Sequence, residues 1–127
     1  EPHLSSVTDT PELALALLER APHAKLTLDY SHFTQQYIPD ERIHPLLPFT
    51  DHFHIRSARP GKLQTRLDEN TIDFIDIADR LNAQGYRRCL SVEYVYMTWF
   101  DCNRVDCLTE TIFTKDLLEP HVSVNWK

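Results

Sequence analysis

The sequence predicts an α/β fold in which parallel strands alternate with helices. Two observations support this prediction. Amphipathic segments with helix-starting residues alternate along the 127 residues with short apolar segments. In each apolar segment the apolar side chains occupy every second position, as in a strand with one buried face. Strands that alternate with helices form a parallel sheet with right-handed crossovers. The length suits one domain, residues 1–127.

The first element is predicted to be a helix over residues 8–21. Pro11 suits a first helical turn, and a Thr-Asp pair before it can cap the chain. Leu13, Leu17 and Leu18 share one side of this helix and are its expected core face.

The middle of the chain predicts two strands and two helices. The strands cover residues 24–30 and 51–57, and a short helix near Asp40–Leu47 lies in the connection between them. A second amphipathic helix is expected within residues 70–86 and ends at Gly85, a residue that commonly terminates helices.

The last two elements are a strand and a helix. Residues 88–95 predict the third strand, and residues 102–119 predict the closing helix, with Leu108 and Ile112 on its apolar face.

Polar side chains end each of the three predicted strands in the same phase. Asp29, His54 and Glu93 each follow a strand whose opposite face is apolar. Neighbouring parallel strands bring such ends together at the carboxyl edge of the sheet, where α/β folds place active sites. One imidazole with several carboxylates and no thiolate suits a divalent ion, either Mn²⁺, Mg²⁺, Co²⁺ or Zn²⁺. The alternative is that each side chain separately caps a helix or meets water.

Glu1 is a further ligand candidate because it directly precedes a loop and a helix. If a strand preceded Glu1, this residue would stand at the end of that strand, as the other candidate ligands do. The alternative is that Glu1 is simply a solvated charge at the terminus.

Five stretches resemble a known family: "EPHLSSVTDTPE", "LTLDYSHF", "FHIRSARPG", "IDFIDIADRLNAQGYRRCLSVEY" and "CNRVDCLTET". They resemble the sugar phosphate isomerase/epimerase family of xylose-isomerase-like TIM barrels. The resemblance covers nearly the whole chain but only the second half of such a barrel. It implies that the chain is the parallel-strand (β/α) half of a TIM barrel, the carboxy-terminal half of a (β/α)8 domain.

The resemblance also implies roles for individual residues. It implies metal ligands at Glu1, Asp29, His54 and Glu93, with Glu1 and Glu93 also forming the catalytic acid/base pair. It implies substrate contacts at His32 and Arg59, with Arg56 as the alternative to Arg59 and with Gln64 as a weaker candidate.

The expected function is that of a divalent-metal-dependent isomerase or epimerase. It would act on a keto sugar, sugar phosphate or polyol by removing a proton next to a carbonyl. The alternatives are a related dehydratase or lyase and a non-catalytic half-barrel domain that binds a metal or a polyol. A phosphodiesterase acting on damaged DNA is disfavoured, since it would need more metal ligands and a basic groove.

Composition limits the partners. The formal net charge of -6 disfavours nucleic acid, and no apolar run approaches the length of about 20 residues that spans a bilayer. Three cysteines without a Cys-x-x-Cys pair indicate reduced thiols and a cytoplasmic protein. A sheet of three strands would have two open edges, so the missing amino-terminal half or a second copy in a homodimer is the expected partner.

Overall fold

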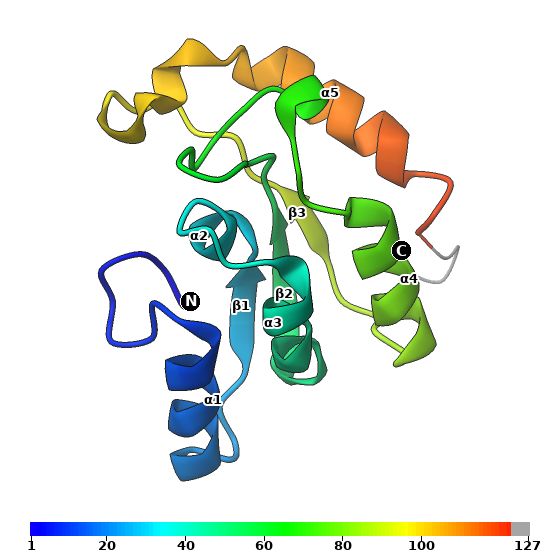
Figure 1. Ribbon diagram of the computed structural model, residues 1–127. Helices are drawn as coiled ribbons and strands as arrows, with labels where there is room; N and C mark the ends of the chain where they lie inside the picture. Colours follow the sequence, from blue (N-terminus) through cyan, green and yellow to red (C-terminus); the bar gives the residue numbers. More distant parts are fainter. Residues whose placement is uncertain (123–127) are drawn as a thin grey trace.

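A three-stranded parallel sheet forms the centre of the computed structural model, which describes residues 1–122 (Figure 1). The strands are β1 (Leu26–Asp29), β2 (Thr50–Ile55) and β3 (Leu90–Val92), in the spatial order β1-β2-β3. Both pairings are parallel, and helices separate the strands along the chain. The mixed α/β class and the parallel sheet are therefore confirmed, whereas membership of a barrel stays a prediction.

Five α-helices and three 3-10 segments connect and flank the strands among residues 1–122. They are α1 (Pro11–Arg20), α2 (Ser31–Thr34), α3 (Asp40–Ile43), η1 (His44–Phe49), η2 (Leu67–Glu69), α4 (Phe74–Ala83), η3 (Trp99–Arg104) and α5 (Cys107–Leu118). The three long helices start at polar caps, because the side chains of Thr10, Asp73 and Asp106 accept hydrogen bonds from backbone N–H groups of the first turns. The short helix α2, directly after β1, was not expected from the sequence.

The register of the strands places the polar residues on one face of the sheet. Asp29 pairs with His54, and His54 pairs with Ser91 on the next strand. Side chains of the opposite phase, such as Leu28 and Phe53, are fully buried in the core. The alternation predicted from the sequence is thus present, and it places the polar strand ends on the face opposite Leu28 and Phe53.

The core face of α1 differs from the prediction. Ala14 and Leu18 are buried, whereas Leu13 and Leu17 are about half exposed. The prediction for Leu13 and Leu17 was wrong because it assigned the leucines to one core face by size and spacing. In the structure the buried stripe of α1 is narrow and is centred on small Ala14.

The helix α5 buries Leu118 as the apolar pattern predicts, but its other buried residues are polar. Leu108 and Ile112 are exposed, while Glu110 and Thr114 are buried. The Glu110 carboxylate accepts a 2.8 Å hydrogen bond from the backbone N–H of Leu67, which satisfies the charge inside the protein. Polar partners on neighbouring segments therefore decide which side of α5 faces inward.

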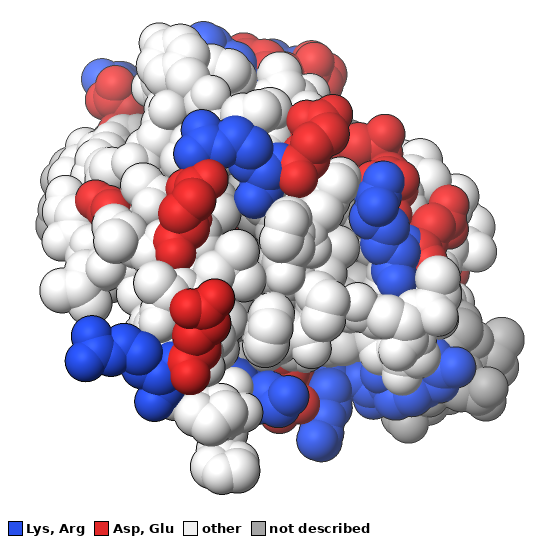
Figure 2. Space-filling model, turned by 60° about the horizontal axis from the view of Figure 1, so that its bottom comes forward, with Lys and Arg blue, Asp and Glu red and all other residues white. Residues whose placement is uncertain are grey.

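The surface carries charges of both signs. Figure 2 shows acidic and basic side chains interspersed over one face of the molecule. Within residues 1–122 no helix combines the length and the apolar character needed to cross a membrane.

Candidate metal centre

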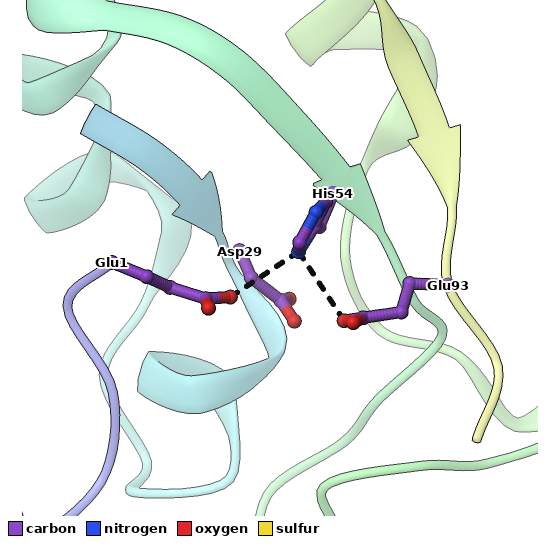
Figure 3. Close-up of side chains that lie close together, drawn as sticks. All are labelled: Glu1, Asp29, His54 and Glu93. Atoms are coloured by element: carbon purple, nitrogen blue, oxygen red, sulfur yellow. Dashed lines mark hydrogen bonds and ion pairs between the residues drawn. The ribbon is translucent and has the colours of Figure 1, made fainter. Parts of the chain in front are cut away.

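Four side chains that the sequence singled out meet at the carboxyl edge of the sheet (Figure 3). Asp29 ends β1, His54 is the next-to-last residue of β2, and Glu93 follows β3 directly. The backbone N–H of Glu93 donates a 2.9 Å hydrogen bond to the carbonyl of Ile55, which continues the sheet as far as this residue. Glu1 approaches from the amino-terminal segment. One ligand atom from each side chain lies within 4.8 Å of those of the other three.

The imidazole of His54 lies between the two glutamates. Its Nδ1 atom is 3.2 Å from Glu1 Oε1 and 3.3 Å from Glu93 Oε2. The two carboxylates reach it from different sides in Figure 3. The side chains of Glu1 and Glu93 are 33% and 34% exposed, so both carboxylates can meet a molecule that arrives from solvent.

The carboxylate of Asp29 is fully buried and held at both oxygens. The backbone N–H of Ser31 donates a 2.8 Å hydrogen bond to Oδ1, and Arg56 donates one to Oδ2. The bond from Ser31 forms where β1 turns directly into α2, a position where an aspartate commonly accepts from the backbone two residues on. The local sequence Asp29-Tyr-Ser31 thus supplies one of the two hydrogen bonds that hold this carboxylate.

The guanidinium of Arg56 pairs with two carboxylates of the cluster. Its Nη2 contacts Asp29 and lies 3.4 Å from Glu93 Oε2, while its Nε donates a 3.0 Å hydrogen bond to Ser31 Oγ. Burial disfavours its charged form, but the charges of Asp29 and Glu93 outweigh burial and raise the pKa of the Arg56 guanidinium. Arg56 is therefore a permanent cation inside the cluster.

The imidazole of His32 lies beside this ion pair. Its Nε2 is 3.2 Å from Arg56 Nη2 and 3.8 Å from Asp29 Oδ2. Its Nδ1 is buried and has no hydrogen-bond partner among residues 1–122. Burial lowers the pKa of His32, and this effect exceeds the opposing effect of Asp29. His32 is thus placed next to the cluster, as the family resemblance implies for a substrate contact, but that role stays a prediction.

The other two predicted substrate contacts are placed differently. Arg59 is part of the loop after β2, where its Nε lies 3.7 Å from Glu69 Oε2. Gln64 is buried, and its amide nitrogen donates hydrogen bonds to the carbonyls of Val95 and Cys102. Its amide oxygen accepts a hydrogen bond from the backbone N–H of Val95. These contacts tie the loop after β2 to the segment after β3, and substrate binding by Arg59 and Gln64 stays a prediction.

Two participants were underrated or missed by sequence reasoning. Arg56 was the second choice behind Arg59, although it is two residues after His54 and therefore points to the same side of the chain. Ser31 was not considered, although the spacing Asp29-x-Ser31 is the signal for a carboxylate that accepts from the backbone.

The four residues could hold a metal ion. They offer three carboxylates and one imidazole, a donor set that suits divalent ions of the first transition row and Mg²⁺. Two ligand atoms on opposite sides of such an ion are about 4.3 Å apart, from bond lengths of about 2.1–2.2 Å. The cluster is therefore close to coordination size, and small side-chain rotations would close the difference.

Comparisons of the chain with protein-family models, with curated proteins and with solved structures found no match. The relation to sugar isomerases and epimerases therefore depends on the resemblance of the quoted motifs and stays a prediction.

Proposed function

We propose that this chain carries the metal-dependent active site of a sugar isomerase or epimerase that moves a proton next to a carbonyl group. One observation carries the proposal: the ligand atoms of Glu1, Asp29, His54 and Glu93 converge within 4.8 Å at the carboxyl edge of a parallel sheet. In folds of this class the active sites lie at that edge.

All four residues, Glu1, Asp29, His54 and Glu93, are proposed to hold the ion. Asp29 and His54 are fixed in place by neighbouring strands. When bound, a divalent ion such as Mn²⁺, Mg²⁺, Co²⁺ or Zn²⁺ would polarise the substrate carbonyl and stabilise the negative charge that develops as the proton leaves. Glu1 and Glu93 approach from different sides and are both accessible. One glutamate can remove the proton from one face of the substrate, and the other can return a proton to the opposite face.

His32 is proposed to orient a substrate hydroxyl, since its ring borders the cluster. Arg59 would first have to leave its contact with Glu69 before it could reach a substrate in the site. The amide of Gln64 is already engaged with backbone groups, so we propose that it acts through the segment it holds.

The remaining walls of the site are proposed to come from further strands. The sheet has two edges and one polar face, and a barrel closes both edges and covers that face. Those strands would be supplied by an amino-terminal half or by a second copy of the chain. The substrate, a keto sugar, sugar phosphate or polyol, would then bind between the metal ligands and the opposite wall.

The experiment that tests this function measures metal binding and proton exchange. The protein is stripped of metal, reconstituted with Mn²⁺, and incubated in D₂O with ketoses of increasing length and with their phosphates. We expect one bound ion per chain and metal-dependent loss of the NMR signal of the proton next to the carbonyl.

The variants Asp29→Asn and His54→Gln should lose both the ion and the exchange. Metal binding that survives in both variants would overturn the assigned centre. A bound ion at these residues without proton exchange on any ketose would overturn the catalytic proposal and favour a metal-binding or polyol-binding domain.

A further inference from the structure

The cation of Arg56 is built into the acidic cluster. Its side chain is almost fully buried and contacts Asp29, Ser31 and Glu93 through two of its nitrogens. A surface arginine that merely neutralised nearby carboxylates would be free to turn into solvent. Here the hydrogen bond from Nε to Ser31 Oγ fixes the guanidinium plane, and the same Ser31 fixes Asp29 through its backbone N–H.

The charges of the cluster then match one divalent ion. Glu1, Asp29 and Glu93 contribute three negative charges, and Arg56 contributes one positive charge. With a neutral His54 as ligand, the protein groups carry two net negative charges. Asp29 and Arg56 are buried, and uncompensated charge beside them is costly in a medium of low polarity, so the centre is most stable when its total charge is near zero. A divalent ion brings the total to zero, whereas a trivalent ion leaves an excess positive charge.

We infer that Arg56 is a positioning residue that sets the charge selectivity of this centre. It holds the carboxylates of Asp29 and Glu93 in place and makes the site select a divalent ion over a trivalent one. This inference rests on the proposed metal centre and assigns to Arg56 a role that acts through the ligands, without contact to the ion.

A clear consequence follows for the ion that the site prefers. Removal of the Arg56 charge leaves three carboxylates without an internal cation, and a trivalent ion then gives the neutral total. Three of the four donors are carboxylates, and hard cations prefer such oxygen ligands, so Tb³⁺ is a suitable trivalent probe. The affinity for Tb³⁺ relative to Mn²⁺ should therefore rise when Arg56 becomes neutral. A loss of structure alone would weaken both ions and would not change their ratio in this direction.

The test compares the ratio of Tb³⁺ to Mn²⁺ affinity in four proteins freed of metal: the parent, Arg56→Gln, Arg56→Lys and Arg88→Gln. Tb³⁺ binding is followed by its luminescence and Mn²⁺ binding by calorimetry. Arg88 is the matched control, because it is exposed and pairs with Asp51 at the other end of β2. We expect the ratio to rise at least about tenfold in Arg56→Gln, as one unit charge a few ångströms away implies. In Arg56→Lys and Arg88→Gln it should stay within about threefold of the parent, since the site charge is kept.

An unchanged ratio in Arg56→Gln would overturn the inference while leaving the metal centre in place. Failure of the parent protein to bind either ion would instead overturn the proposed function. If Arg56→Gln does not fold without an ion, the concentrations of Tb³⁺ and Mn²⁺ that restore its circular dichroism give the same ratio. If neither ion restores the fold, Arg56→Lys decides: a parent-like ratio supports the charge role, and a shift of about tenfold or more contradicts it.

Discussion

Arg56 and Asp29 form a buried ion pair that joins the carboxyl ends of β1 and β2. Asp29 is the last residue of β1, and Arg56 is the first residue after β2. Both side chains are almost completely removed from solvent. The pair therefore fixes the edge of the sheet on which the candidate ligands lie.

Loss of the Arg56 guanidinium should strongly destabilise the metal-free protein. The variant Arg56→Met leaves the buried carboxylate of Asp29 without its counterion, and breaking a buried pair in this way costs about 3–5 kcal/mol. The free energy of unfolding is measured by urea titration in the presence of a chelator. The control Arg88→Met removes an exposed pair with Asp51 and should cost less than about 1 kcal/mol. Equal losses in the two variants would contradict the structural role of the buried pair.

The position of His54 predicts a large loss of metal affinity in the variant His54→Ala. Loss of a residue that only supports a ligand weakens metal binding by up to about 100-fold. Removal of one of the four ligands themselves should therefore weaken Mn²⁺ binding by more than about 100-fold. The control is His52→Ala, which removes the neighbouring imidazole, 5.0 Å between ring centres, without removing a ligand. Calorimetric titration with Mn²⁺ compares the two. A similar affinity in both variants would show that His54 is not a ligand.

The polar phase of the strands was sufficient to predict the meeting of Asp29, His54 and Glu93. Strand alternation is a local property, and a parallel sheet fixes which strand ends are neighbours. The buried face of α5 could not be predicted in this way. Glu110 is buried because Leu67, distant in sequence, offers it a backbone N–H, and no periodicity in α5 indicates that partner.

The same limit applies to the ion pair at the site. The sequence shows that Arg56 and His54 point to the same side of the chain. It does not show that the Arg56 guanidinium donates a hydrogen bond to Ser31, which follows a different strand. Tertiary partners of this kind decide which charged groups are buried.

Gln64 is predicted to stabilise the fold through its buried amide. The variant Gln64→Ala leaves the backbone groups of Val95 and Cys102 without partners, which should lower the free energy of unfolding by about 1–3 kcal/mol. Since Gln64 is outside the ligand cluster, Mn²⁺ affinity should change less than about tenfold. Urea titration and calorimetry on the same preparations test both statements. An unchanged stability together with a higher KM for substrate would instead support direct substrate contact.

Tyr86 predicts a loss of stability at high pH. Its hydroxyl donates a 2.8 Å hydrogen bond to the carbonyl of Cys89 just before β3, and burial raises the pKa of Tyr86 to about 12. The folded state thus favours the neutral phenol, so this stabilisation is present below the ordinary pKa of about 10 and is lost as the pH rises toward 12.

The variant Tyr86→Phe removes this pH dependence. Its free energy of unfolding should therefore fall less steeply than that of the parent between about pH 9 and about pH 12, the range in which tyrosine titrates. Tyr96→Phe is the control, because Tyr96 is largely exposed. Urea titrations at a series of pH values give the slopes, and parallel slopes for Tyr86→Phe and the parent would contradict the prediction.

The two accessible glutamates predict complementary defects in proton transfer. Glu1 and Glu93 reach the centre from different sides, so each should serve one face of the substrate. The variants Glu1→Gln and Glu93→Gln keep an oxygen that can bind an ion but cannot accept a proton. Each should lose net epimerisation and still exchange the proton of one epimer with D₂O, and the two variants should act on opposite epimers. NMR on separate samples of the two epimers, with Mn²⁺ bound, measures this exchange. If one variant retains full epimerisation, that glutamate is not a catalytic base, and a mechanism with a single base would replace the pair.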